Sequence, residues 1–163
     1  MSSAIQRGFL PSPEPGRQLF SDLPPEAAKD FDQIKSLASF PRGTVLFREG
    51  EWAGRVMVLC RGRVKLSVCS ESGQRLTLHV AGPGEVLGLS AALTRSAHEM
   101  TAEVLDNAQV AMVERADLLP FLRDHRQVCL QAAKLLSQDL HQAYERVRTV
   151  GLMRTRRPRV HTH

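Results

Sequence analysis

The stretch Gly82-Pro83-Gly84-Glu85-Val86-Leu87-Gly88-Leu89-Ser90-Ala91 lies near the middle of the 163-residue chain, within a region of short apolar segments. Its glycines and proline predict tight turns, and the small and apolar residues after Gly88 predict the start of a short helix. Short apolar segments dominate before this stretch and for some distance after it. Beyond Glu114 the apolar residues recur at helical spacing.

The central part of the chain, from Thr44 to Glu114, contains several short apolar runs bounded by glycine and other turn residues. Spacings of about 8–12 residues between such runs predict an antiparallel sandwich or barrel. The turn chemistry of Ser70 to Gly73 predicts a hairpin between two alternating strands. The expected strands are 44–47, 56–60, 64–68, 76–80, 101–105 and 108–113.

Helices are predicted on both sides of this region, at 25–37, at 115–122 and at about 126–150. Along the last one, apolar residues recur at alternating intervals of four and three, which is a heptad pattern. A helix of about 25 residues is close to 38 Å long, which is more than a small barrel covers. We therefore expect a homodimer through this helix, although it could instead lie flat on its own barrel. The predicted dimer seam is Cys129, Ala133, Leu136, Leu140, Ala143, Val147 and Val150.

The net charge of +5 is unevenly distributed, because four arginines lie in the last ten residues. Without them, 18 basic residues face 17 acidic ones, from totals of 22 and 17. The near-neutral body argues against a basic nucleic-acid-binding domain. No apolar run reaches the roughly 18 residues of a membrane span, and no signal peptide begins the chain. Three cysteines without a Cys-x-x-Cys pair fit a reducing cytoplasm.

Four segments taken in order resemble one family of proteins: 46–51, 58–66, the Gly84-Glu85 stretch and the terminal helix pair. Together they are similar to the cyclic-nucleotide-binding sensor domain of the cyclic AMP receptor/fumarate–nitrate regulator (Crp/Fnr) family, over about Leu23 to Leu152. The resemblance implies a mainly β fold, a double-stranded β-helix (jelly roll) with flanking helices, followed by a long dimerisation helix. It implies a non-enzymatic effector sensor of a transcription regulator.

A cyclic phosphate would need backbone N–H donors at a helix start and an arginine, and a ribose hydroxyl would need a carboxylate. The turn and helix start of the central stretch offer the donors, and Glu85 offers the carboxylate. There is a plainer interpretation of both residues. Gly84 would then form only a tight turn, and Glu85 would be a solvated acid in a loop. The expected pocket is Gly84, Glu85, Gly88, Leu89, Ser90, Arg95, Ser96, Met100, Thr101 and Tyr144.

Two departures argue against a cyclic AMP binder of the family's usual kind. Where the family has Arg-Ser/Thr-Ala, this chain has Glu99-Met100-Thr101, and Arg95-Ser96-Ala97 comes about four residues early. Where cyclic AMP-binding members have a Thr-Ser pair on the long helix, this chain has Ala143-Tyr144. We therefore expect no certain cofactor, and either a cyclic nucleotide or another small effector as ligand. The cysteine-free segment 1–39 argues against an iron–sulfur cluster.

An enzyme of the cupin class, which shares the jelly-roll architecture, is the alternative. Such an enzyme needs clustered histidines and a glutamate around a metal. We expect instead that His79 is a partly buried strand residue, that His98 is solvated, and that Cys60 and Cys69 are small core residues.

These expectations divide the chain into four parts. They are a flexible arm (1–22), the jelly roll (23–124), the dimerisation helix (125–152) and a basic tail (153–163), where the family's helix-turn-helix would begin. We expect a truncated regulator without sequence-specific DNA binding, which could pair with a full-length relative.

Overall fold

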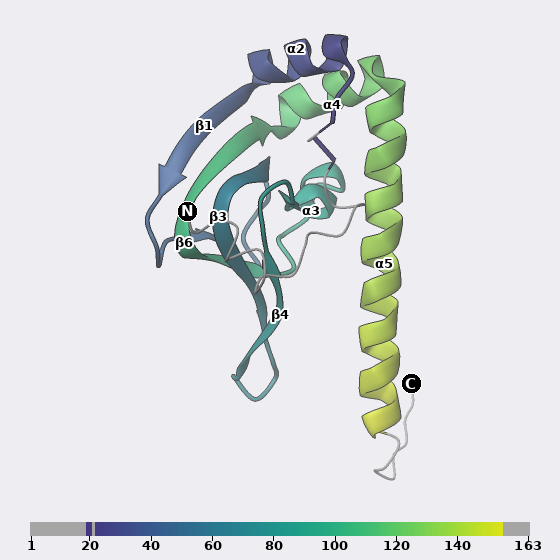
Figure 1. The fold of residues 1–163 in the computed structure, drawn as a ribbon. Helices are drawn as coiled ribbons and strands as arrows, with labels where there is room; N and C mark the ends of the chain where they lie inside the picture. The colour runs from purple at the N-terminus through teal and green to yellow at the C-terminus, as the bar shows by residue number, and fades with distance from the viewer. Residues whose placement is uncertain (1–18, 21, 155–163) are drawn as a thin grey trace.

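The structure is a computed structural model that describes residues 19, 20 and 22–154, with the backbone alone for 140 and 142–154. A single antiparallel sheet system is flanked by helices, and the longest helix runs along one side of the molecule (Figure 1). The mainly β class with flanking helices is confirmed. The elements are α2 (Pro25–Ile34), β1 (Lys35–Phe40), β2 (Val45–Phe47), β3 (Arg55–Cys69), β4 (Arg75–Ala81), β5 (Val86–Leu87), α3 (Leu89–Leu93), β6 (Thr101–Glu114), α4 (Arg115–Asp124) and α5 (Arg126–Arg154).

Two long strands, β3 and β6, form the centre of the sheet, whose order is β1-β6-β3-β4. They pair from Arg55 opposite Glu114 to Ser67 opposite Thr101. The short strand β2 pairs with β6, and β5 pairs with β3. The central stretch of the sequence is therefore attached to the middle of the sheet through Val86 and Leu87.

Two predicted strand breaks are absent, because 56–60 joins 64–68 and 101–105 joins 108–113. The residue that predicted the first break, Gly62, adopts a φ of +91° within β3. Its neighbours on both sides keep pairing with β6 across register shifts. A glycine with positive φ allows such a bulge without ending the strand.

The predicted helix 25–37 is wrong at its C-terminal end. The helix stops at Ile34, and Lys35–Phe40 pairs with six residues of β6. These backbone pairs outweigh a local apolar spacing that also fits a helix, since secondary-structure propensity is weak against tertiary pairing.

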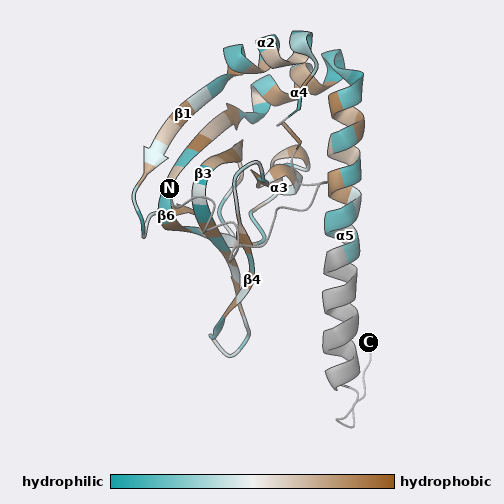
Figure 2. Cartoon of the chain, in the orientation of Figure 1, coloured by the Kyte–Doolittle hydropathy of each residue, from teal (hydrophilic) through white to brown (hydrophobic). Residues whose placement is uncertain are grey.

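Alternate residues of β3 and β6 face two separate cores. Val56 and Val58 pack with residues of α2, α3, α4 and α5, whereas Met57 and Leu59 pack inside the barrel with Phe47 and other residues. Period-two alternation of side chains produces this division. Figure 2 shows apolar residues along these strands and where the helices meet them.

Two residues that precede the expected domain boundary at residue 23 lie in the core of the domain. Leu19 and Phe20 are buried in the core beneath the helices, and the Phe20 ring stacks on Phe31 with centroids 4.6 Å apart. These two residues of the predicted arm (1–22) thus pack with the domain. A further correction concerns Cys60 and Cys69, which are exposed rather than buried in the core. Both lie on β3, Cys60 at a register shift and Cys69 as the last residue of the strand.

Helix α5 uses one face to pack on its own domain. Val128, Ala132 and Leu135 are buried there, whereas Cys129 and Ala133 of the predicted seam are exposed. The next seam residue, Leu136, is partly buried against the core. The remaining seam side chains, those of Leu140, Ala143, Val147 and Val150, lie outside the described residues. No helix in the described part of the chain is long and apolar enough to cross a membrane.

Candidate functional site

The turn before β5 places Glu85 inside the protein. Gly84 has a φ of +94°, and its N–H donates to the carbonyl of Leu59 at 2.6 Å. The chain then reverses, with the Glu85 N–H donating to the Gly82 carbonyl at 3.2 Å. Glycine accepts this positive φ without steric cost, which explains the residue type at position 84.

The carboxylate of Glu85 is bonded through both of its oxygens. Oε2 accepts the Gly82 N–H at 2.9 Å, and Oε1 lies 2.8 Å from Nε2 of His79 on β4. Glu85 is only 2% exposed, and His79 is partly buried as expected. A buried carboxylate requires such partners. Glu85 thus presents no free oxygen to the solvent, and the solvated loop acid that we considered is not what the structure shows.

The short helix α3 follows at once. Gly88 precedes it with a φ of +79°, and the helix buries Leu89 while Ser90 is partly exposed. The first N–H groups of a helix have no partner within it, so the donors expected here are present in the backbone. Five residues later the chain turns again, and the Ser96 N–H donates to the Ala91 carbonyl at 2.9 Å.

Arg95, the arginine that the sequence offered for an anion, is exposed and has a φ of +55°. It lies in the turn with Ser96, whose hydroxyl is 2.8 Å from that of Thr94. Arg95 and Ser96 are therefore on the surface beyond the C-terminus of α3, whereas the first N–H groups of this helix lie at its other end. The structure does not bring Arg95 together with those donors.

His98 is buried, at 7% exposure, and not solvated as expected. Its ring stacks on Phe47 with centroids 3.7 Å apart, and it fits against Gly88, where an added Cβ would lie 3.0 Å from Cε1. Burial lowers the pKa of His98, with an opposing effect from the nearby charge of Glu51. The expectation failed because loop position says little about burial when an aromatic ring covers the loop.

The segment after His98 is fixed to the loop before β3. The His98 carbonyl accepts the Gly50 N–H at 2.8 Å, and the His98 N–H donates to the Glu51 carbonyl at the same distance. Thr101 is buried, and its hydroxyl oxygen accepts the Glu49 N–H at 2.9 Å. Met100 packs against the barrel core. Met100 and Thr101 therefore serve packing and loop attachment in this structure.

The pocket that the sequence predicted is thus only partly assembled. Gly84 to Ser90 and His98 to Thr101 meet at Gly88, but Arg95 lies outside and the Tyr144 side chain is not described. Sequence reasoning missed the Glu85–His79 pair and the His98–Phe47 stack. One signal could have suggested the Glu85–His79 pair: the acid follows the strand histidine by six residues, across a turn.

The alternative prediction, a cupin-like enzyme, requires a metal site. His79 has one acidic partner, Glu85. In the part of the chain that the structure describes, no group of three or more His, Cys, Asp or Glu residues is arranged to hold a metal ion. Nothing in these residues favours that alternative.

The known proteins that this chain resembles include bacterial proteins of the cyclic AMP receptor type. The cyclic AMP receptor protein of Thermus thermophilus is 27% identical over 128 residues, which are 78% of this chain and 59% of the relative. A CRP-like cAMP-activated global transcriptional regulator of Mycobacterium tuberculosis is 22% identical over 75% of this chain and 54% of its own length. The chain thus spans a little over half the length of these curated relatives.

Solved structures give the same result. The catabolite activator protein of Thermus thermophilus superposes with a TM-score of 0.75 at 25% identity, over 82% of this chain and 63% of the other. The N-terminal domain of a transcriptional regulator from Streptomyces coelicolor superposes with a TM-score of 0.64 at 26% identity, over 78% and 89%. The family described as the cyclic nucleotide-binding domain matches residues 37–125, more than half of the chain. The chain belongs to the cyclic nucleotide-binding domain family.

Proposed function

We propose that the chain is the effector-sensing domain of a Crp/Fnr-type transcription regulator that does not bind cyclic AMP in the family's usual way. It acts in the cytoplasm as a homodimer and carries no catalytic activity of its own. The observation that carries the proposal is the state of Glu85, whose carboxylate is buried and bonded on both oxygens. An effector that needs this carboxylate would first have to displace His79 and the Gly82 N–H.

The surroundings of α3 support the same conclusion. The predicted phosphate partner, Arg95, lies beyond the far end of this helix and is exposed. Buried His98 lies against Gly88, and its burial lowers its pKa, which favours the neutral ring. A neutral ring cannot balance a phosphate charge as an arginine does. The remaining donors are backbone N–H groups, which suit a small effector of lower charge.

Calorimetric titration of the purified chain with cyclic AMP and cyclic GMP tests the proposal. We expect no measurable binding of either nucleotide. Binding with micromolar affinity would contradict it, and the Arg95→Gln variant would then show whether that arginine reaches the ligand. Native mass spectrometry of freshly isolated protein would identify a retained effector by its mass.

The homodimer is supported by the surface of α5. Cys129, Leu130 and Ala133 are exposed beside the face that packs on the domain, and Leu130 is 60% exposed. Small residues such as Ala133 allow a second helix to approach closely. The same surface could pair with a related chain, so a heterodimer with a full-length relative is part of the proposal.

Sedimentation velocity tests the dimer. Ala133→Glu should give a monomer, because two introduced carboxylates would face one another across the seam. Gln131→Glu adds the same charge on the opposite side of the helix and should leave the dimer intact. A dimer that persists in Ala133→Glu would contradict the seam.

A further inference from the structure

A second pocket lies on the outer face of the sheet, where β1, β6 and β3 run side by side. It has a volume of about 330 Å³ and is lined by Ser39, Phe40, Pro41, Arg61, Asn107, Ala108 and Gln109. None of these residues belongs to the candidate site around α3. In Figure 1 the end of β1 lies on the side of the molecule away from α5. This size is at the small end of the range for ligand pockets in proteins.

Hydrogen-bond donors converge on this pocket because the strand register places them in one row. Ser39 is opposite Gln109, and Gln109 is opposite Arg61. Residues that are directly opposite on neighbouring strands share a face, with their Cβ atoms about 5 Å apart. The row therefore presents a hydroxyl, an amide and a guanidinium side by side.

Asn107 adds a further donor. Its Oδ1 accepts the backbone N–H of Arg42 at 2.9 Å, which fixes the amide so that its NH₂ group remains available. Pro41 is exposed and supplies an apolar edge beside these polar groups, whereas the Phe40 and Ala108 side chains pack toward the barrel core. The pocket thus combines several donors with a small apolar surface, as expected of a site for a small organic molecule.

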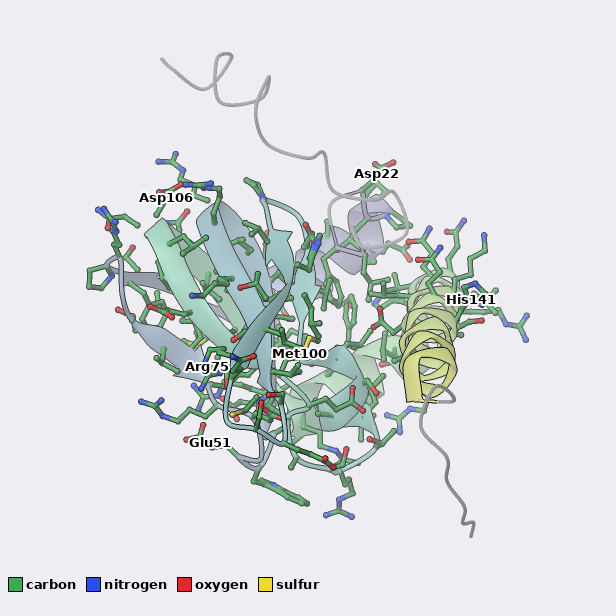
Figure 3. The ribbon with its side chains drawn as sticks, turned by 90° about the horizontal axis from the view of Figure 1, so that it is seen from below. Asp22, Glu51, Arg75, Met100, Asp106 and His141 are labelled. Atoms are coloured by element: carbon green, nitrogen blue, oxygen red, sulfur yellow. The ribbon has the colours of Figure 1, made fainter. Side chains whose placement is uncertain are left out.

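The charge around the pocket is positive. Within the described part of the chain Arg61 has no ion pair with a carboxylate. The neighbouring Arg63 is paired with Asp106 through two nitrogens, and Arg42 also acts on Asp106, whose pKa is lowered mainly by the Arg63 hydrogen bond. The negative charge of Asp106 therefore balances only one of the three positive charges of Arg42, Arg61 and Arg63. Figure 3 shows Asp106 across the barrel from Glu51 and Arg75.

We propose that this pocket binds a small molecule carrying an oxyanion, held by the guanidinium of Arg61 together with the side chains of Gln109, Ser39 and Asn107. A guanidinium binds phosphate and carboxylate oxygens through two parallel hydrogen bonds. The exposed ring of Pro41 accommodates the carbon part of the ligand. Phosphate esters and small carboxylic acids share this chemistry, and the experiment separates them.

Titration of the ¹⁵N-labelled full chain, followed by two-dimensional NMR at constant ionic strength, tests the proposal. The probes are inorganic phosphate and succinate, with chloride as the reference anion. We expect saturable shifts of the Ser39 and Gln109 amides and the Arg61 side chain, at a dissociation constant of about 10 mM or lower. Saturation by phosphate alone assigns a phosphate group, and saturation by succinate alone assigns a carboxylate.

Matched variants decide whether Arg61 is responsible. Arg61→Gln should weaken binding roughly tenfold, because the charge-assisted pair is lost. Arg126→Gln removes the same charge from exposed α5 and should change nothing. Gln109→Leu keeps the charge and should weaken binding while leaving the spectrum folded. Absence of saturable shifts with both probes, or equal affinity in Arg61→Gln and Arg126→Gln, would overturn the proposal.

Discussion

Replacing Glu85 by alanine tests whether its carboxylate holds the turn before β5 together. The change removes the acceptors for the Gly82 N–H and for Nε2 of His79, which lie 2.9 and 2.8 Å from its two oxygens. A buried donor that loses its partner costs about 1–3 kcal/mol. The His79 side chain is 33% exposed, so water replaces part of its bond. We expect the free energy of unfolding to fall by about 2–4 kcal/mol.

Urea denaturation followed by circular dichroism measures this loss, and the melting temperature should fall by about 2–4 °C for each kcal/mol. Glu85→Gln keeps an acceptor oxygen of the same shape and should lose roughly half as much. Glu99→Ala removes an exposed carboxylate in the same region and should stay within about 0.5 kcal/mol of the parent. If Glu85→Ala were no less stable than Glu99→Ala, the structural role of this carboxylate would be refuted.

Two further predictions concern His98 and Gly62. Burial lowers the pKa of His98, so its contribution to stability is complete above about pH 6.5 and is lost as the pH falls towards the lower pKa of the folded state. His98→Gln should reduce the fall in melting temperature between about pH 7.5 and pH 5. An unchanged dependence of the melting temperature on pH would contradict this role of His98. A Cβ at Gly62 would lie 2.5 Å from the Asn107 carbonyl oxygen, whereas Gly73, also at positive φ, has nothing within 4 Å. Gly62→Ala should therefore lose about 3 kcal/mol or more, against about 1 kcal/mol for Gly73→Ala, and equal losses by urea denaturation would contradict the steric argument.

The sheet was predictable from local sequence where each strand carries its own signal. Alternation in Leu76 to Val80 and the turn from Ser70 to Gly73 gave β4 and its hairpin, in which Gly73 donates to the Ser70 carbonyl. Strand β1 had no such signal, because its pairing depends on β6, more than 60 residues later in the chain. Likewise, a glycine that signals a turn in isolation becomes a bulge when both flanking segments pair with one long strand.

The site was harder to predict because its side chains are bonded to residues that are distant in sequence. The sequence singled out Glu85 as the acid that matters, but not the direction in which it points. That direction depends on the turn at Gly84, which places the carboxylate beside β4. His98 was misjudged for the same reason, since Phe47, which covers it, lies on β2. Neither of these two contacts can be inferred from the composition of the sequence or from the spacing of its residues.

The position of α3 has a consequence for how an effector could act on the rest of the molecule. Leu89 and Ala92 of this helix lie in the same core as Val128, Ala132 and Leu135 of α5. The side chain of Arg115, at the start of α4, donates to the Ala92 carbonyl at 2.7 Å. Because protein cores are close-packed, a displacement of α3 cannot be absorbed without repacking its neighbours. A ligand that moves α3 must therefore disturb the packing that seats the first turns of α5, the helix on which the proposed dimer depends.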